Sequence, residues 1–175
     1  FGREVARRLA ARGERLALLD RDRAGLDATL AQLGARAQAH VEVADVTDEA
    51  AVRAAVERAE RELGRLGHVF HSAGVLAVGP FESPPPREYR RRIAGNSPGT
   101  VHVALAAVPA LRRATASGRA TLTLVASIAG LRGFPELAGY SASKFAVVGF
   151  AQALAAELEG TGIDVKTLCP PAGDT

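Results

Sequence analysis

The stretch from Val125 to Phe150, VASIAGLRGFPELAGYSASKFAVVGF, determines how this chain is organised. It begins at the end of an apolar run of β type, residues 120–126, and ends in a run whose apolar residues recur at helical spacing. Tyr140 and Lys144 are four residues apart on that helix, so both side chains lie on one face. An ammonium beside a phenol favours the ionised phenol, which makes the pair a candidate acid and base.

Ser127 directly follows the apolar run and is therefore expected at the end of a strand. In a parallel α/β sheet, reacting groups gather where the strands end at their carboxyl side and the next helix begins. Ser127 and Tyr140 would then converge from the two ends of one strand-to-helix connection. A serine hydroxyl there could hold a carbonyl or alcohol oxygen while the tyrosine exchanges a proton with it.

Strand-like and helical patterns alternate along the whole chain. This alternation predicts a parallel sheet with crossover helices, a doubly wound, Rossmann-like α/β fold in three layers. Without a repeat, a low-complexity tract or a linker, residues 1–175 are expected to form a single domain. Thr47 is expected to cap the helix that follows it. The expected strands are 15–19, 39–43, 69–72, 120–126 and 163–168, and the main helices are 5–10, 26–33, 49–64, 87–113 and the one that bears Tyr140.

The composition argues against several classes of protein. The chain is 47% hydrophobic but has no apolar run approaching about 18 residues, so we expect no membrane span. Arginines mixed with acidic residues account for the net charge of +3, and we expect no nucleic-acid partner. The single cysteine, Cys169, excludes an internal disulfide and favours a reducing, cytoplasmic location. The histidines lack the spacing of metal ligands, so no metal is expected.

Ser127, Tyr140-x-x-x-Lys144, Asn96 and the tetrapeptide HSAG at 71–74 together resemble a short-chain dehydrogenase/reductase along the whole chain. The resemblance implies a nicotinamide dinucleotide and the interconversion of a secondary alcohol and a ketone. In the family, Tyr140 would be the general acid and base, and Ser127 would orient the substrate oxygen. Lys144 would favour the ionised phenol and hold the nicotinamide ribose. The backbone carbonyl of Asn96, the fourth member of the set, would hold a water that connects Lys144 to solvent.

The resemblance also assigns residues to the cofactor. Asp20 would accept hydrogen bonds from the adenosine ribose, which favours NAD over NADP because a 2′-phosphate would meet like charge. Arg21 weakens this preference, since a guanidinium beside the ribose could offset the repulsion. The remaining cofactor contacts implied by the family pattern are Gly2, Asp45, Val46, Ala73, Gly74, Tyr140, Lys144, Pro170 and Thr175.

The chain departs from the family pattern at several places. His71-Ser72 replaces two asparagines that commonly brace the sheet and the cofactor, and Pro171 replaces a glycine. The chain contains no methionine, and the family's first strand and most of its glycine-rich turn do not occur in it. We therefore expect a piece of a longer protein, lacking the first strand and the C-terminal segment. The strands at 15–19 and 69–72 would then have unpaired edges.

The candidate site residues also have purely structural interpretations. Asn96 could mark a helix break, Ser127 could be only a turn residue, and Asp20 could simply start the next helix. Ser141-x-x-Lys144 fits the nucleophile signature of penicillin-recognising enzymes, but the accompanying motifs Ser-Asp-Asn and Lys-Thr-Gly do not occur. A second hypothesis is therefore an inactive remnant or scaffold module that binds NAD weakly or not at all.

The resemblance further implies a homo-oligomer, a dimer or a tetramer, formed through the helices that bear Asn96 and Tyr140. The apolar residues available for such a contact are Val101, Leu105, Val108, Phe145, Val148 and Ala155, although these could equally face their own sheet. The other expected partner is a small-molecule alcohol or ketone. Neither composition nor spacing distinguishes steroid, sugar, polyketide or simple ketone substrates.

Overall fold

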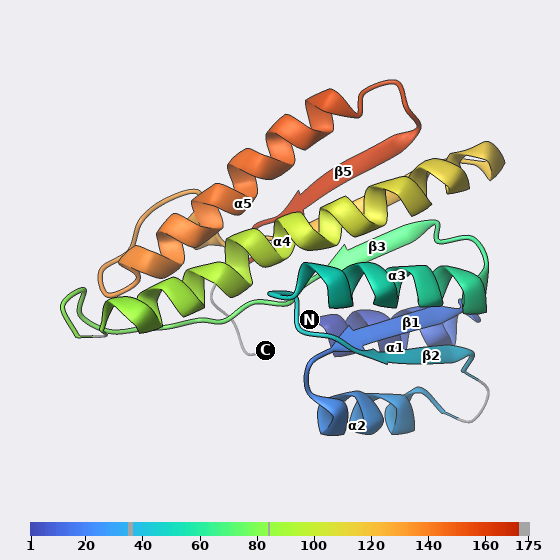
Figure 1. Ribbon diagram of the computed structural model, residues 1–175, viewed down its shortest axis with the longest axis horizontal. Coiled ribbons are helices and arrows are strands. Elements are labelled where there is room, and N and C mark those ends of the chain that lie inside the picture. The colour runs from blue at the N-terminus through green and yellow to red at the C-terminus, as the bar shows by residue number, and fades with distance from the viewer. Residues whose placement is uncertain (35–36, 84, 172–175) are drawn as a thin grey trace.

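The computed structural model describes residues 1–34, 37–83 and 85–171. Helices and strands alternate along the chain, which confirms the expected α/β class (Figure 1). The elements are α1 Gly2–Ala11, β1 Leu16–Asp20, α2 Arg23–Leu33, β2 Ala39–Val43, α3 Glu49–Leu63, β3 His68–His71, α4 Pro86–Ala114, the 3-10 turn η1 Thr115–Ser117, β4 Ala120–Val125, the 3-10 turn η2 Ile128–Gly130, α5 Ala138–Glu157 and β5 Ile163–Leu168.

The strands form two parallel sheets. β1 pairs with β2 in one of them, from Leu16 opposite Ala39 to Asp20 opposite Val43. In the other, β4 is the central strand between β3 and β5. Among the described residues no backbone ladder joins β1 to β3, and this is the interruption expected between the strands at 15–19 and 69–72.

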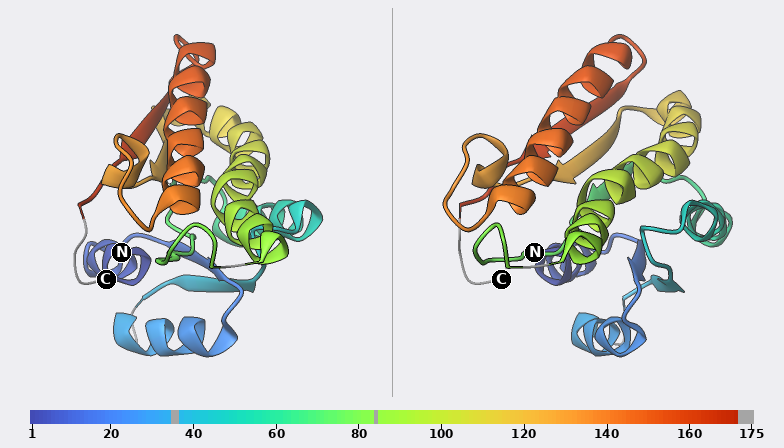
Figure 2. Two further views of the ribbon diagram at one scale, coloured as in Figure 1. Left: turned by 90° about the vertical axis from the view of Figure 1, so that its left-hand side faces the viewer. Right: turned by 60° about the vertical axis from the view of Figure 1, so that its left-hand side comes forward.

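Helices lie on both sides of the strands (Figure 2). α3, α4 and α5 lie together on one side, and α1 lies on the opposite side of the β1–β2 sheet. α4 packs against both α3 and α5, so it connects the two sheets on that side. This arrangement agrees with helix layers that flank a parallel sheet.

The main hydrophobic core lies between β4 and the helices α4 and α5. Leu122 and Leu124 on β4, together with Leu111 on α4, have no exposed surface. Alternate residues of a strand point to one face, which is why these two β4 leucines enter the core together. Complete burial of each leucine contributes about 1.5–3 kcal/mol.

α4 runs from Pro86 to Ala114 without interruption, which confirms the helix expected at 87–113, so the interpretation of Asn96 as a helix break is wrong. The helix even includes Pro98 and Pro109, each of which lacks the N–H that would donate to the carbonyl four residues earlier. α4 packs against both α3 and α5. Asn96 itself is 2% exposed.

The turn before α3 differs from the expectation. Asp48, not Thr47, is the N-cap, and its carboxylate accepts a hydrogen bond from the Ala51 N–H at 3.0 Å. Thr47 instead donates its own N–H and hydroxyl to Asp45 Oδ1, at 2.9 and 2.8 Å. Because the Thr47 hydroxyl is engaged by the Asp45 carboxylate, the next residue, Asp48, caps the helix instead.

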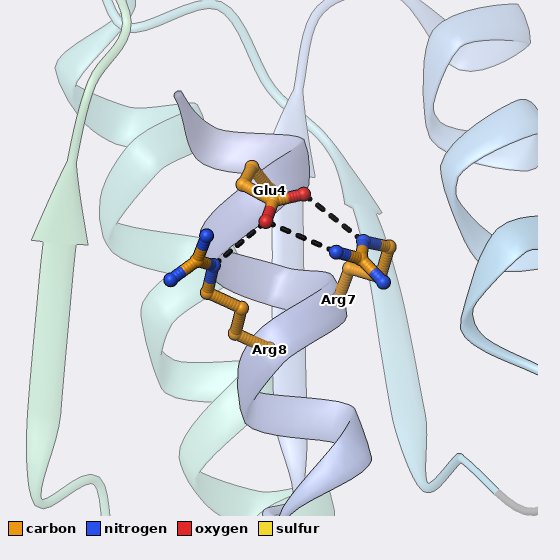
Figure 3. A network of polar contacts seen from close by, with 3 residues as sticks. All are labelled: Glu4, Arg7 and Arg8. Carbon is orange, nitrogen blue, oxygen red and sulfur yellow. Dashed lines mark hydrogen bonds and ion pairs between the residues drawn. The ribbon is translucent and has the colours of Figure 1, made fainter.

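Ion pairs cover the helix surfaces, in keeping with the mixed arginine and acid pattern. On α1, Glu4 accepts hydrogen bonds from Arg7 and Arg8, one turn away on the same face (Figure 3). These two guanidinium groups lower the pKa of Glu4 to about 2.

In the described ranges, no helix is both long enough and apolar enough to cross a membrane.

Candidate active site

Tyr140 and Lys144 lie on the same face of α5, as their spacing predicted, with Lys144 Nζ 5.7 Å from the centre of the Tyr140 ring. Lys144 is 5% exposed, and its Nζ donates to the Val125 carbonyl at the end of β4 at 3.0 Å. Burial lowers the pKa of the Lys144 ammonium, although the nearby Cys169 opposes this shift. The ammonium is thus fixed at the point where β4 ends.

Ser127 follows β4 directly and caps η2, with its Oγ accepting a hydrogen bond from the Ala129 N–H at 3.1 Å. Gly130 in the same turn packs on the backbone of α5, because a Cβ there would lie 2.7 Å from the Lys144 carbonyl oxygen. This close approach holds the Ser127 segment against the helix that bears Tyr140 and Lys144. Within the described chain the hydroxyl proton of Ser127 has no acceptor and is available to a ligand oxygen.

The side chain of Asn96 connects the loop after β3 to α5. Its Oδ1 accepts from the Val75 N–H at 2.8 Å, and its Nδ2 donates to the Val75 carbonyl and to Ser143 Oγ, both at 3.0 Å. Ser143 in turn donates to the Tyr140 carbonyl at 2.7 Å. The Asn96 amide is therefore fully used within the protein, and it fixes the position of the helix turn that carries Tyr140.

Gly74 lies directly over this group of residues. A Cβ at Gly74 would be 3.1 Å from Asn96 Oδ1 and 3.3 Å from Lys144 Nζ. The exposed backbone of Ala73 and Gly74 therefore runs beside the buried ammonium. A ligand that touches this backbone comes within reach of Lys144.

The N-terminal end of α1 adjoins the same region, because a Cβ on Gly2 would lie 2.9 Å from Ser72 Oγ. Gly2 is the first residue of α1, and the free N–H groups at a helix N-terminus favour bound anions. A cavity of about 300 Å³ opens next to them, and its wall consists of Phe1, Phe70, Val125, Leu168, Cys169 and Pro170. The Pro170 carbonyl accepts from the Ile128 N–H at 2.9 Å, which ties the segment after β5 to η2.

Asp20 is the last residue of β1 and Asp45 lies two residues after β2, so both belong to the other sheet from the strand end that holds Lys144. Asp20 is exposed, and its Oδ1 accepts from the Asp22 N–H at 3.0 Å. Arg21 points to the second strand, with its Nη1 3.4 Å from Asp45 Oδ2. Hydrogen bonds from Thr47, with a smaller effect of Arg21, lower the pKa of Asp45.

Val46 is packed against α4. Its carbonyl accepts from His102 Nδ1 at 2.9 Å, and its side chain would be 2.7 Å from a Cβ placed on Gly99. Both contacts serve the interface between α3 and α4, so a role of Val46 toward a cofactor stays a prediction. Thr175 lies outside the described residues.

Two loops border the first turn of α5. The Gly79 N–H donates to the Glu136 carbonyl at 3.0 Å, which links the loop after β3 to the loop before α5. The Tyr89 ring packs directly on Gly139, where a Cβ would be only 2.3 Å from the ring. The Phe81 ring meets Tyr89 edge to face at 5.8 Å. These contacts position the backbone immediately before Tyr140.

The sequence interpretation missed two members of the polar network, Thr100 and Ser143. Each lies one helical turn from a residue that it named, Thr100 four residues after Asn96 and Ser143 three after Tyr140, and this spacing was the available signal. The Ser-x-x-Lys alternative finds no support, because Ser141 Oγ is buried without a partner in the described structure while Lys144 Nζ is held by Val125.

Among residues 1–34, 37–83 and 85–171, no three histidine, cysteine, aspartate or glutamate side chains lie close enough together to hold a metal ion.

Comparison with known proteins adds independent information. A family model described as short chain dehydrogenase matches residues 1–175. A protein named inactive 2-(S)-hydroxypropyl-CoM dehydrogenase 2, from Xanthobacter autotrophicus, is 39% identical over 95% of this chain and 70% of its own length. D-threitol dehydrogenase from Mycolicibacterium smegmatis is 35% identical over 97% of this chain and 65% of its own length.

Solved structures of reductases resemble this chain as well. A crystal structure of 3-ketoacyl-(acyl-carrier-protein) reductase from Brucella melitensis, complexed with NADH, superposes with a TM-score of 0.89 at 31% identity. The match covers 99% of this chain and 71% of that one. The chain thus spans about two thirds of the length of these proteins, from 65% to 71%.

Proposed function

Because the chain belongs to the short chain dehydrogenase family, we propose that the full-length protein is an NAD(P)-dependent oxidoreductase that interconverts a secondary alcohol and a ketone. The observation that supports this most directly is the buried Lys144 ammonium, held by Val125 beside the Tyr140 ring and under the exposed backbone of Gly74. A general base, a fixed cation and an accessible backbone meet there.

In this proposal the residues of the chain manage the proton. Tyr140 takes the hydroxyl proton of the alcohol, and the Ser127 hydroxyl donates a hydrogen bond to the same substrate oxygen and keeps its proton. Lys144 holds a positive charge 5.7 Å from the centre of the Tyr140 ring. The nicotinamide, when bound, supplies the hydride chemistry at the substrate carbon. The start of α1 at Gly2 suits its phosphates, and the exposed backbone of Gly74, beside Lys144, suits its ribose.

Replacing Tyr140 with phenylalanine tests the assignment of the base. In the full-length protein we expect Tyr140→Phe to reduce alcohol-dependent NADH formation by at least about 100-fold, because the proton acceptor is lost. NAD affinity, measured by fluorescence titration, should stay within about twofold, since the ring remains. The chain has two tyrosines, so Tyr89→Phe is the matched control, and it should keep its activity because the ring still packs on Gly139. An active Tyr140→Phe variant would disprove the assignment.

We further propose that the cofactor is NAD in preference to NADP. Asp20 presents an exposed carboxylate after β1, and Arg21 is directed to Asp45 instead of toward Asp20. A 2′-phosphate near Asp20 would meet like charge with no guanidinium committed to it. Titration with both dinucleotides should give tighter binding of NAD, and Asp20→Asn should narrow the difference. An equal affinity of the unchanged protein for NADP would refute this.

A second candidate is a non-catalytic member of the family. It is favoured by the similarity to a protein that is named inactive, and by the replacement of the expected asparagines by His71 and Ser72. Under this alternative the full-length protein has no turnover with any alcohol or ketone, and NAD titration shows weak binding or none. Under the enzyme hypothesis NAD binds and at least one alcohol is oxidised.

We also propose a homo-oligomer formed through α4 and α5. Leu105 and Phe145 on these helices are 59% and 46% exposed, so both offer apolar surface to a second copy of the chain. A groove of about 350 Å³ between the two helices is lined by Ser97, Pro98, Thr100, Val101, His102, Ala146, Val147 and Phe150. Analytical ultracentrifugation should show a dimer or tetramer, and Leu105→Glu with Phe145→Glu should shift it toward monomer. A monomeric unchanged protein would exclude this assembly.

A further inference from the structure

His71, the last residue of β3, is a buried imidazole with one defined partner. It is 6% exposed, and its Nε2 lies 3.1 Å from Thr100 Oγ1 on α4. Thr100 donates its single hydroxyl proton to the Asn96 carbonyl at 2.6 Å. The hydroxyl can therefore only accept from the histidine, which places the proton on His71 Nε2. Two successive hydrogen bonds, from His71 to Thr100 and from Thr100 to the Asn96 carbonyl, therefore connect β3 to the turn of α4 that contains Asn96.

That turn of α4 needs such support. Pro98 lies two residues after Asn96 and cannot donate to the Ala94 carbonyl, so one helical hydrogen bond is missing there. A threonine that bonds the carbonyl four residues earlier tends to bend a helix further. A donor on β3 that fixes the Thr100 hydroxyl limits this movement, because it holds the hydroxyl in one orientation.

The position of Asn96 controls the proposed acid and base. Its amide holds Val75 on one side and Ser143 on the other, and Ser143 holds the Tyr140 carbonyl. All the side chains that connect β3 to Tyr140 are nearly inaccessible, with exposures of 6% for His71, 2% for Thr100 and Asn96, and 1% for Ser143. Such a hydrogen-bonded network, excluded from water, fixes the relative position of three elements.

This series of hydrogen bonds also requires that the His71 imidazole be neutral. Burial, together with the positive charge of Lys144, lowers the pKa of His71 to about 4. β4, which pairs with β3, has no titratable side chain, so Lys144 on α5 is the charged group that faces the ring from the elements packed around it. At neutral pH the uncharged His71 thus donates a hydrogen bond to Thr100 and adds no second positive charge beside Lys144.

We propose that His71 is a positioning residue, whose Nε2–H holds Thr100 and, through it, the Asn96 turn that sets Tyr140 and Lys144 relative to the loop after β3. The proposal depends on the oxidoreductase function for its kinetic consequence but not for its structural one. It gives a defined role to one of the two positions where the chain departs from the asparagines of the family pattern.

The test uses four single variants of the full-length protein and one double variant, Thr100→Val combined with His71→Leu. Thr100→Val removes the hydroxyl at nearly constant volume, and His71→Leu removes the donor. His71→Gln retains an N–H at about the reach of Nε2. The control is Thr29→Val on α2, because Thr29 has the same geometry away from the site: its hydroxyl is buried, donates to the Gly25 carbonyl at 2.7 Å and accepts from Arg3 Nε at 3.1 Å.

We expect Thr100→Val and His71→Leu each to lower kcat about tenfold or more, with the KM of the alcohol changed less than about twofold, because positioning is lost and not binding. The kcat of the double variant should be no lower than that of the less active single variant, because Thr100 and His71 act along one path. His71→Gln should recover most of kcat, and Thr29→Val should not change it. Multiplicative effects in the double variant, or an unchanged kcat in Thr100→Val, would overturn the proposal.

A measurement without turnover separates this proposal from the enzyme hypothesis. Nitrogen NMR of the imidazole should show His71 as the neutral Nε2–H tautomer from pH 8 down to about pH 5. In Thr100→Val this tautomer preference should weaken. A protein that lacks activity but shows this tautomer would refute the proposed function alone. An Nδ1–H or a charged His71 at neutral pH would refute the positioning role, whatever the activity.

Discussion

Leu122 on β4 is fully buried, whereas Leu19 on β1 is 37% exposed, and this contrast extends to the two halves of the molecule. The C-terminal half, β3–β5 with α4 and α5, contains the main apolar core and the polar network of Asn96 and Ser143 inside it. The N-terminal half, α1–α3 with β1 and β2, relies more on ion pairs, including that of Glu42 with Arg58.

The difference corresponds to the two tasks proposed for the site. Proton transfer requires that Tyr140 and Lys144 stay within a fraction of an ångström of their places, and a close-packed core with satisfied polar groups provides this. Recognition of a ribose by Asp20 requires only an accessible carboxylate at a strand end. The half that is proposed to carry the chemistry is therefore the rigid one.

The largest effect that would sharpen this comparison is truncation of a core leucine. Leu122→Ala should lower the free energy of unfolding by about 3–4 kcal/mol, because a fully buried side chain leaves a cavity. Leu16→Ala, on β1 and 8% exposed, should cost about 2 kcal/mol, since neighbours and water can fill the space more easily. Urea unfolding followed by circular dichroism measures both.

Leu30→Ala on α2 is the exposed control for these variants, with 38% of the residue accessible, and it should cost less than about 1 kcal/mol. If Leu16→Ala destabilised the protein as much as Leu122→Ala, the two halves would not differ in packing, and the comparison would fail.

Acid should affect the C-terminal half before the N-terminal one. The pKa of His71 falls from 6.5 to about 4 on folding, so between these values the unfolded chain binds a proton that the folded protein does not. Stability is then complete above about pH 6.5 and falls by about 3 kcal/mol as the pH drops to about 4, at 1.36 kcal/mol for each pKa unit.

Urea midpoints at pH 7, 5.5 and 4.5 would show this loss, and His71→Gln should remove most of it because no imidazole remains to be charged. A midpoint that is independent of pH over this range in the unchanged protein would contradict the burial of a neutral His71.

In the N-terminal half the corresponding group is Glu42 on β2. Its side chain is 9% exposed, accepts hydrogen bonds from Arg58 Nε and Nη2 at 2.8 Å each, and lies 2.7 Å from His40 Nε2. Arg58, with a smaller effect of His40, lowers the pKa of Glu42 to about 2. Its contribution is therefore present above about pH 4.5 and is lost only as the pH falls toward about 2.

Glu42→Gln should lower the free energy of unfolding at pH 7 by about 2 kcal/mol, because Arg58 keeps its charge without a counterion. The value is below that of a fully buried pair since Arg58 is 45% exposed. Thermal unfolding gives the measurement. Glu60→Gln, which breaks a more exposed pair with Arg113, is the matched control and should cost less than about 1 kcal/mol.

The smallest effect is expected on the surface of α1. Glu4 pairs with Arg7 and Arg8 in short contacts (Figure 3), yet all three side chains are about half exposed or more. Water and salt screen such pairs, so Glu4→Gln should leave the thermal midpoint unchanged within error. A midpoint that dropped as far as that of Glu42→Gln would show that ion pairs support this half regardless of their burial.

Much of the fold follows from local pattern. The strands expected at 39–43 and 163–168 coincide with β2 and β5, because apolar and polar residues alternate in both segments, as is typical of a half-buried strand. The cap of α3 was misplaced by one residue, since Thr47 and Asp48 are both good caps and only the competing carboxylate of Asp45 decides between them. The helix expected at 87–113 coincides with α4, Pro86–Ala114, and so passes through Pro98 as expected. Its packing against both α3 and α5 could not be predicted from local pattern, because these helices are distant along the chain.

The sequence by itself determined that this chain is an α/β member of its family and that Tyr140 and Lys144 share one helix face, because both properties depend on the spacing of neighbouring residues. Only the tertiary structure decided what those side chains touch. Lys144 is held by Val125, and Tyr140 is linked through Ser143 to Asn96. The partners come from segments distant along the chain, and burial makes each unmet hydrogen bond costly, so the packing of β3, β4, α4 and α5 selects them.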